Sequence, residues 1–492
     1  MTTSDKKTGK SILEQIARRV MQEQGFLPDF SSAALEEMEQ IQNTIAPVTA
    51  VKKDLRQLLW ASIDNDDSKD LDQLTVAEVL PGGAVKVYVA VADVDTLVKK
   101  NDAIDEHAHQ NTTSIYTAGK TFPMLPENLS TNLTSLNYQE DRPAIIVEIT
   151  VSDSGDIQGS DIYPAVVRNH AKLAYNAVAA WLEGKETAPD KSIVVDAALA
   201  GNLRIQDTVA QKLRAKRHLR GALELQTLET LPIFDGDEIK DLQIDETNRA
   251  KEIIEDFMIA ANDVTAVFLK GKRIPSLRRV VRSPKRWDRI VEIAAQHNFQ
   301  LPVAPDSKAL ADFLVKQKAA DPLRFPDLSL VIIKLLGSGE YVVELPDETA
   351  PGHFGLAVKD YTHSTAPNRR FPDLITQRIL KATLGGMSQP YSQSELTELA
   401  QHCTLKEDDA NKVERQIAKS AAAMLLSSRV GNIFDAICTG AADKGTWVRI
   451  FQPPIEGRLL HGFEGIDVGS QLKVKLIHVD VNMGFIDFEK VN

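Results

Sequence analysis

Five aspartates crowd into nine residues near the start of the chain, within the sequence SIDNDDSKDLDQ of residues 62–73. These are Asp64, Asp66, Asp67, Asp70 and Asp72. Carboxylates at this density repel one another, and burying them without a compensating charge costs stability. Carboxylate oxygens are also the ligands that Mg²⁺ prefers. A Mg²⁺ site is therefore the simplest interpretation of the cluster.

Three interpretations of this cluster compete. A solvated acidic loop is the usual fate of a charge run. An EF-hand-like calcium loop starting at Asp64 would place Lys69 where the motif requires glycine and Thr75 where it requires glutamate, so it fails at two positions. The third interpretation is a two-metal phosphodiester hydrolase, whose paired ions activate a water and stabilise the leaving oxygen.

The segments on either side of the aspartates have the pattern of β-strands. An apolar run at residues 58–63 precedes them, and another follows at residues 74–80. After a Pro-Gly-Gly turn, valines alternate at positions 85, 87, 89 and 91. Alternation with period two around a glycine turn predicts a hairpin, so the acidic segment is expected to be a loop between strands. Rigid strands would position its carboxylates well for a hard metal ion.

The whole chain has an ordinary globular composition, with 492 residues of which 43% are hydrophobic and 26% charged. Cys403 and Cys438 lie far apart without metal-ligand spacing, which fits a reducing compartment. No run of about 18 apolar residues occurs, and the first ten residues are polar. We therefore expect a soluble, cytoplasmic protein without a membrane partner.

The formal net charge of -12 argues weakly against nucleic-acid binding, because phosphates bind to clustered Lys and Arg. The local distribution of charge matters more than the sum. Two basic stretches, residues 212–220 and 270–286, could line an approach to an acidic metal site. Each could equally be a solvated face.

The chain divides into three regions by pattern. Residues 1–50 are expected to be helical, with a capping box at Ser11 and Glu14 and a second helix at residues 33–44. Residues 51–430 are predicted to form one α+β catalytic domain, with long helices at residues 245–270 and 394–429. Residues 431–492 carry about five short alternating strands, which suit an OB-fold barrel that binds RNA.

Six sequence blocks resemble the ribonuclease II and ribonuclease R family, also called the RNB family, and they follow in the family's order. They are SIDNDDSKDLDQ, FPMLPENLSTNLTSLN, KLAYNAV, RGAL, IIEDFMIAAN and YTHSTAPNRRFPDL. The resemblance implies an RNB-type catalytic domain followed by a ribosomal-protein-type RNA-binding barrel. Many relatives carry cold-shock domains ahead of the catalytic domain. With about 50 residues in that place, this chain is expected to be a short, bacterial-type member without them.

The resemblance also implies a metal site. Asp64 and Asp70 match the first two family aspartates, which hold Mg²⁺, with Mn²⁺ as a possible substitute. Asp72 matches the third, the aspartate most closely tied to cleavage. Gln73 stands where the family has a fourth aspartate, which is a departure. Its amide carbonyl can ligate a hard cation but brings no charge, so we expect one metal to be held more weakly.

Five further residues gain roles from the same resemblance. Tyr116 matches a tyrosine that stacks on a base, and Tyr175 matches one close to the metals. Arg369 and Arg370 match the pair that grips phosphates, a task that suits guanidinium because it bonds two oxygens at once. Glu255, which with Asp256 matches an acidic pair of the family, is expected to bind a ribose hydroxyl or a residue that supports the metal ligands. The predicted catalytic residues are therefore Asp72, Tyr175 and Arg369, and the predicted RNA-binding residues are Tyr116, Arg369, Arg370 and Glu255.

The function that follows is a processive, two-metal exoribonuclease. We expect it to draw in single-stranded RNA from the 3′ end and release nucleoside 5′-monophosphates, acting as a monomer. Contacts to the 2′-hydroxyl would favour RNA over DNA. The alternative from another class is an RNA-binding or regulatory protein that keeps the fold but has lost turnover through Gln73. An endonuclease or DNA nuclease with the same chemistry is a more distant possibility.

Overall fold

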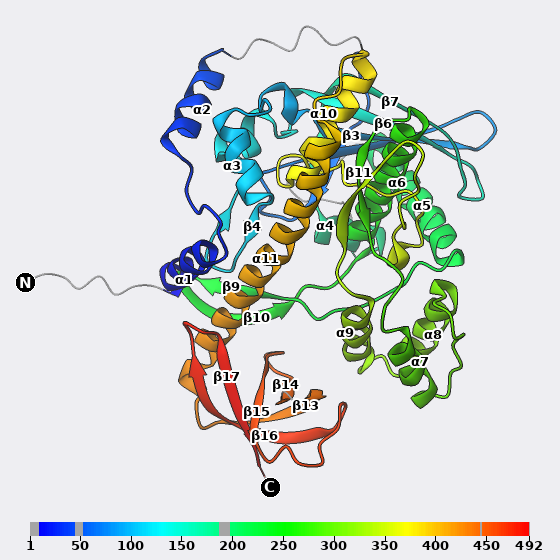
Figure 1. Cartoon of the computed structure of the whole chain (residues 1–492). Helices are drawn as coiled ribbons and strands as arrows, with labels where there is room; N and C mark the ends of the chain where they lie inside the picture. Colours follow the sequence, from blue (N-terminus) through cyan, green and yellow to red (C-terminus); the bar gives the residue numbers. More distant parts are fainter. Residues whose placement is uncertain (1–8, 45–52, 186–196, 443–444, 492) are drawn as a thin grey trace, which may run out of the picture.

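The computed structural model describes residues 9–44, 53–185, 197–442 and 445–491. Figure 1 shows a large body of helices and strands above a smaller barrel, with the long helix α11 (Gln393–Leu426) running from one to the other. The fold is thus α+β, as predicted. The predicted boundary at residues 50 and 51 lies outside the described residues, and the division into three regions stays a prediction.

A six-stranded sheet with the order β7-β6-β3-β2-β1-β8 organises the body. Every neighbouring pair is antiparallel except β1 and β8, which run parallel. The strands are β1 (Ala61–Asp64), β2 (Gln73–Val79), β3 (Val85–Ala92), β6 (Asp141–Val151), β7 (Ile157–Arg168) and β8 (Ala171–Ala174). The predicted hairpin is β2–β3, and the acidic loop joins β1 to β2 as expected.

Two helices pack their apolar faces on this sheet. Helix α6 (Arg249–Gly271) buries Phe257 and Ala261, and α10 (Phe371–Gly385) buries Ile375, in the same core as the sheet valines. The helix predicted for residues 245–270 begins later, at Arg249, because the Asn248 side chain accepts hydrogen bonds from the next turn and caps the helix. Helix α5 (Ala197–Leu219) packs beside α6.

The N-terminal region contains α1 (Gly9–Glu23) and α2 (Ser32–Thr44). The capping box predicted at Ser11 is wrong, because Ser11 lies inside α1. The break between the two helices falls at Gly25 and Pro28, as the sequence indicated. Helix α1 packs on α11 and on the small hairpin of β4 (Ile115–Tyr116) and β5 (Thr121–Phe122), burying Leu13 and Ile16 there.

The remaining elements complete the body. Helix α3 (Ala103–Asn111) packs on α2, and α4 (Tyr175–Leu182) follows β8. Two more antiparallel pairs are β9 (Thr230–Asp235) with β10 (Glu238–Ile244), and β11 (Ser276–Val280) with β12 (Glu340–Glu344). A small helical cluster holds α7 (Trp287–Gln296), α8 (Ser307–Ala320) and α9 (Phe325–Leu336) around Phe313 and Phe325.

The C-terminal strands close into a five-stranded barrel with the order β13-β14-β15-β17-β16, consistent with the predicted OB fold. They are β13 (Ile433–Ala442), β14 (Gly445–Ile450), β15 (Glu456–His461), β16 (Gln471–Asp480) and β17 (Phe485–Lys490). The barrel shares an apolar core with the end of α11, through Leu425 and Leu426, and with Leu242 of β10. Among the described residues, no helix combines the length and apolar character needed to cross a membrane.

Candidate active site

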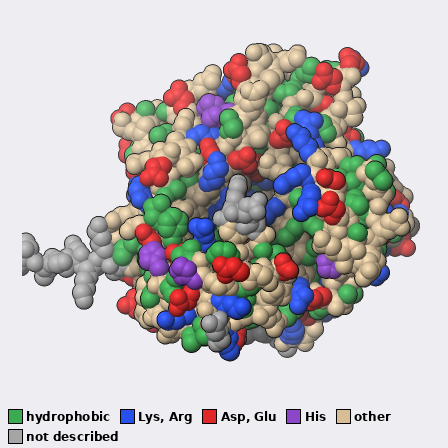
Figure 2. Space-filling model, turned by 60° about the horizontal axis from the view of Figure 1, so that its bottom comes forward, with side chains coloured by type: hydrophobic (Ala, Val, Ile, Leu, Met, Phe, Trp, Pro, Cys, Tyr) green, Lys and Arg blue, Asp and Glu red, His purple; other side chains and the backbone are tan. Residues whose placement is uncertain are grey.

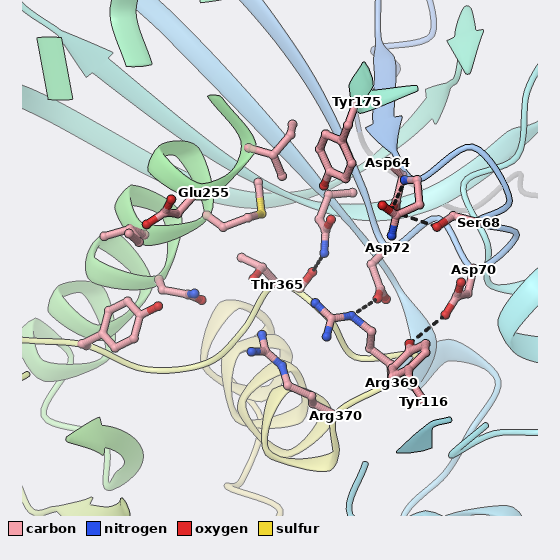
Figure 3. Close-up of a pocket in the computed structure, with 17 residues that line it drawn as sticks. Asp64, Ser68, Asp70, Asp72, Tyr116, Tyr175, Glu255, Thr365, Arg369 and Arg370 are labelled. Carbon is pink, nitrogen blue, oxygen red and sulfur yellow. Dashed lines mark hydrogen bonds and ion pairs between the residues drawn. The ribbon is translucent and has the colours of Figure 1, made fainter. Parts of the chain in front are cut away.

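A polar cavity of about 460 Å³ lies where the acidic loop meets the loop before α10. Figure 3 shows Asp64, Asp70 and Asp72 on one side of it, Arg369 and Arg370 next to them, and Glu255 on α6 across from them. The cavity is lined by every residue for which the sequence predicted a site role: Asp64, Asp70, Asp72, Gln73, Tyr116, Tyr175, Glu255, Arg369 and Arg370. The structure therefore brings the whole predicted set together.

Asp72 is the most deeply buried of the acids, with 3% of its surface exposed. Its Oδ1 accepts a hydrogen bond from the backbone N–H of Asn368 at 3.0 Å. Its Oδ2 finds no hydrogen-bond partner among the described residues, although Arg369 Nε stands 3.4 Å away as an ion pair. Burial raises the pKa of Asp72 to about 7, with a further increase from Asp70, while Arg369 opposes the shift.

Asp64 lies at the start of the acidic loop, and Asp70 lies six residues further along it. Asp64 ends β1, and its Oδ1 accepts hydrogen bonds from Asn65 N–H at 2.8 Å and Ser68 Oγ at 2.9 Å. Burial raises the pKa of Asp64, and the neighbouring Asp70 adds to the shift. The other two aspartates of the cluster, Asp66 and Asp67, are exposed to solvent.

Two side chains for which the sequence analysis predicted no role bind the backbone of the acidic loop. Ser135 Oγ accepts from the N–H of Leu71 and donates to the carbonyl of Lys69, both at 2.9 Å. Lys172 Nζ donates to the carbonyl of Ser68 at 2.6 Å. Ser135 lies in the matched block FPMLPENLSTNLTSLN and Lys172 in the block KLAYNAV. Their place in these blocks was a sign that they matter to the site, although it did not show what they bind.

The loop of residues 361–370 brings the arginines to the acids. Asn368 is buried and accepts from Thr134 Oγ1 at 2.5 Å, which fixes the turn before the arginines. Arg369 then extends over Asp72. Arg370 caps the start of α10 and pairs with Asp373 at 2.7 Å, so part of its charge is already balanced.

The two predicted tyrosines both face the cavity. Tyr116 is 45% exposed, so it is not a core tyrosine, and its hydroxyl donates to Asp70 Oδ2 at 3.3 Å. Tyr175 is the first residue of α4, next to the β1–β8 pair. Burial raises the pKa of each hydroxyl, and the nearby carboxylates Asp70 and Asp64 raise it further, so both phenols stay protonated.

His363 packs between the rings of Tyr341 and Tyr361. It is half-buried within the loop of residues 361–370, and its Nδ1 lies 2.8 Å from the hydroxyl of Tyr341. Burial and the neighbouring Arg370 lower its pKa well below the usual value, so the ring is neutral.

The two basic stretches are largely occupied by ion pairs. In the first, Lys212 pairs with Asp153, Lys216 with Asp156, and Arg217 with Asp256. In the second, the pairs are Lys270–Asp360, Arg273–Asp347, Arg278–Glu344, Arg279–Glu407 and Arg282–Glu340. Their structural role is therefore larger than the sequence indicated. Figure 2 nevertheless shows Lys and Arg side chains on both sides of a hollow in one face of the molecule.

The donor set fits a divalent cation by its chemistry. Among the described residues, no three His, Cys, Asp or Glu side chains stand in an arrangement that could hold a metal ion. Asp64, Asp70 and Asp72 line one cavity, however, and the buried Asp72 Oδ2 lacks a hydrogen-bond partner within that same part of the chain. A cation would supply the missing partner and remove the like-charge repulsion.

Comparison with known proteins identifies the same two parts of the chain, the body and the barrel. A family model described as the RNB domain matches residues 52–386, and one described as the RNase II-type exonuclease C-terminal S1 domain matches residues 432–491. The chain is 31% identical over 428 residues to ribonuclease R of Escherichia coli (strain K12), a match that covers 84% of this chain and 51% of that relative. The chain thus spans about half the length of this relative.

Two solved structures share the fold. Mycoplasma genitalium RNase R in complex with ribose methylated single-stranded RNA matches with a TM-score of 0.87 and 24% identity, covering 97% of this chain and 78% of the other. The same protein in complex with double-stranded RNA matches with a TM-score of 0.86 and 25% identity, covering 97% and 83%.

Fold and site together define an α+β protein that joins a carboxylate-lined cavity to a C-terminal OB-type barrel. The RNB match extends over more than half of the chain. The chain therefore belongs to the RNB family, with the C-terminal S1 domain of that family, as the resemblance implied.

Proposed function

We propose that this protein is a divalent-metal-dependent exoribonuclease that degrades single-stranded RNA from its 3′ end. The observation that carries the proposal is the buried Asp72, whose unbonded Oδ2 lies in one cavity with Asp64, Asp70 and Arg369. Carboxylates beside a guanidinium match the needs of phosphodiester hydrolysis, which must hold a cation and a phosphate together. The relatives named ribonuclease R support the same assignment.

Each residue of the cavity has a task in this proposal. Asp64, Asp70 and Asp72 would hold Mg²⁺ or Mn²⁺, and the bound metal would activate the attacking water and stabilise the leaving oxygen. Arg369 binds the scissile phosphate, since its guanidinium already lies beside the acids. Tyr175 borders the metal-binding acids and keeps its proton, so it can donate a hydrogen bond to a phosphate oxygen.

The rest of the cavity positions the RNA strand. The half-exposed ring of Tyr116 offers a face on which a base can stack, whatever its sequence. Arg370 provides a second positive charge near the strand, and Glu255 can accept a hydrogen bond from a ribose 2′-hydroxyl, which would favour RNA over DNA. The barrel would hold the strand outside the cavity, as OB folds commonly do. Repeated cleavage in this arrangement would release nucleoside 5′-monophosphates.

A 5′-labelled single-stranded RNA oligomer tests the proposal, with Mg²⁺ or with EDTA, beside DNA of the same sequence. We expect a metal-dependent one-nucleotide ladder on RNA alone, ending in a short core. Internal fragments would instead indicate an endonuclease. Intact RNA at saturating protein would favour the RNA-binding alternative, for which the neutral Gln73 among the acids is the specific observation.

A further inference from the structure

Gln73 joins the two loops that form the cavity. It is the first residue of β2, fixed by pairing with Val91 of β3, and its side chain lines the cavity next to Asp72. The side-chain Nε2 donates a hydrogen bond to the backbone carbonyl of Thr365, on the loop that carries Arg369 (Figure 3). The two bonded residues are 292 positions apart in the chain.

The orientation of the amide follows from its partner. A backbone carbonyl can only accept, so the nitrogen of Gln73, and not its oxygen, must face Thr365. A carboxylate at this position has no hydrogen to donate and would set oxygen against oxygen. An amide is therefore required for this contact, and an aspartate or glutamate would break it.

This contact lies beside a second one between the same loops. The N–H of Asn368 donates to Asp72 Oδ1 at 3.0 Å, and Arg369 Nε stands 3.4 Å from Asp72 Oδ2. Asp72 and Gln73 thus hold the arginine loop at two neighbouring points. The Asp72 contact would be shared with any bound cation, whereas the Gln73 contact involves neutral groups only and does not compete with one.

We propose that Gln73 is a positioning residue that holds Arg369 against the acids, and that the three aspartates alone carry the cation. The proposal rests on the proposed function and replaces the ligand role predicted for Gln73. In this proposal, the amide of Gln73 helps to place the phosphate by holding the loop that carries Arg369. A fourth carboxylate at this position would strengthen metal binding, but it could not hold that loop.

Mn²⁺ alone, titrated into the RNA-free protein and followed by electron paramagnetic resonance, tests the ligand part. In Gln73→Met, which keeps the length of the side chain without donor or carbonyl, the Mn²⁺ affinity should stay within about twofold. In Gln73→Glu, the added carboxylate should tighten Mn²⁺ binding. A drop of about tenfold or more in Gln73→Met would overturn the proposal, since it would mean that the amide is a ligand.

Hydrogen exchange of residues 361–370 tests the positioning part and does not depend on catalysis. Exchange should rise in both variants, and RNA affinity in EDTA should fall about five- to tenfold, the value of one hydrogen bond. Gln40→Met, an exposed glutamine of α2, is the matched control and should change neither. Unchanged exchange in Gln73→Glu would overturn the proposal, and unchanged exchange in the barrel shows that each variant is folded.

These results separate the inference from the proposed function. If the wild-type protein yields no RNA ladder, the nuclease assignment fails, while the exchange and Mn²⁺ measurements still decide what Gln73 does. If the ladder forms and the exchange of residues 361–370 is the same in all variants, the nuclease assignment stands and the positioning role fails.

Discussion

At the scale of single residues, Asp72 combines two roles that a substitution can separate. Its Oδ1 accepts from the Asn368 N–H, and its Oδ2, paired with Arg369, has no hydrogen-bond partner among the described residues. Asn in its place can still accept from Asn368 but carries no charge. Loss of an outer partner of a metal ligand typically costs about 10- to 100-fold in activity, so loss of a ligand should exceed that range.

We therefore expect Asp72→Asn to lower RNA hydrolysis by more than about 100-fold while RNA affinity changes by less than about threefold. Single-turnover cleavage of labelled RNA measures the first quantity, and fluorescence anisotropy in EDTA measures the second. Asp66→Asn is the control, because Asp66 is exposed outside the cavity lining. An equal loss of hydrolysis and binding in Asp72→Asn would contradict the role assigned to this carboxylate.

A second prediction at this scale concerns His107 in α3, which is buried against Phe30 with its Nε2 3.1 Å from Asn111 Nδ2. Burial lowers the pKa of His107 to about 4, against 6.5 for an exposed histidine, and Asp29 opposes the shift only in part. Because the folded state resists protonation, His107 stabilises the protein fully above pH 6.5. This stabilisation is lost as the pH falls from 6.5 towards 4.

His107→Gln keeps an acceptor for Asn111 and removes the titration. The variant should be less stable than the wild type at pH 7.5, and its deficit in unfolding free energy should shrink by about 2 kcal/mol between pH 6.5 and 5. Urea unfolding at the two pH values, followed by the signal of the body, measures this change. A deficit that is the same at both pH values would show that folding does not lower the pKa of His107.

The residue types at the site could be predicted, because metal and phosphate binding require particular side chains. The contacts that these side chains make could not be predicted. The aspartates, Tyr175 and the arginines could be named from the sequence blocks, and Tyr116 lies between two of those blocks. The donation from Gln73 to Thr365, by contrast, joins positions 292 residues apart, and no local pattern encodes such a distance in sequence. The same is true of Ser135 beneath the acidic loop, since a buried serine has no signature of its own.

At the scale of elements, the small hairpin β4–β5 carries Tyr116 and is supported from two sides. The Tyr116 N–H donates to Glu414 Oε1 of α11 at 2.8 Å. On the other side, the hairpin turn lies so close to α1 that a Cβ at Gly119 would come within 2.8 Å of the backbone nitrogen of Glu14. Lys120 and Glu14 add an ion pair at 3.2 Å. Helix α1 therefore helps to determine where the ring of Tyr116 stands.

Gly119→Ala should push α1 and the hairpin apart, because backbone atoms cannot yield as flexible side chains do. We expect RNA affinity in EDTA to fall several-fold and stability to fall by about 1–3 kcal/mol, the usual cost of overpacking. Gly159→Ala in β7 is the matched control, since its new Cβ would meet no described atom within 4 Å. Equal RNA affinity in both variants would mean that α1 does not position Tyr116.

Element type was predicted better than element ends. The alternating valines gave β3, and the run of Ala and Leu gave α11, whose capping box at Ser392 and Glu395 sets its start. Ser11 and Glu14 have the same spacing, yet α1 begins before them. Side-chain capping and continuation of the helix differ by only about 1 kcal/mol, so packing on α11 decides between them.

At the scale of the whole molecule, the net charge of -12 is a poor guide to what the protein binds. Most charged side chains of the two basic stretches form ion pairs within the body. One example is the pair of Arg278 and Glu344, which are both buried. Arg369 instead stands at the cavity. Sequence reasoning could identify the stretches but not their partners, because these come from other elements.

Two contacts between the barrel and the body matter for this prediction, beside the hydrogen bond that Arg19 Nη2 of α1 donates to the carbonyl of Asn482 at 2.9 Å. One is the apolar core shared with α11 and β10, and the other is the buried pair of Arg449 on β14 and Asp327 on α9, at 2.5 Å. Burial raises the pKa of Asp327 and Arg449 lowers it, so the carboxylate depends on the guanidinium for its charge. Removing Arg449 would leave an uncompensated buried carboxylate, which costs about 3–5 kcal/mol.

Arg449→Met should therefore release the barrel on the α9 side while α11 keeps it attached. RNA of about 30 nucleotides, long enough to contact both the cavity and the barrel, should bind several-fold more weakly. Two linked sites bind one strand more tightly than either site alone only while the distance between them is fixed, and this variant would let that distance vary. RNA of about five nucleotides, chosen to be too short to contact both sites at once, should bind as before. Fluorescence anisotropy in EDTA measures both affinities.

The control is Lys473→Met, which also removes one positive charge from the barrel but breaks only an exposed pair with Asp435. Such surface pairs contribute about 0–1 kcal/mol, so this variant should lower the affinity for both lengths only slightly. If Arg449→Met weakened short and long RNA alike, the change would have reached the cavity, and the barrel would not act as a separate holding site. A loss confined to long RNA assigns the barrel to the part of the strand that has not yet entered the cavity.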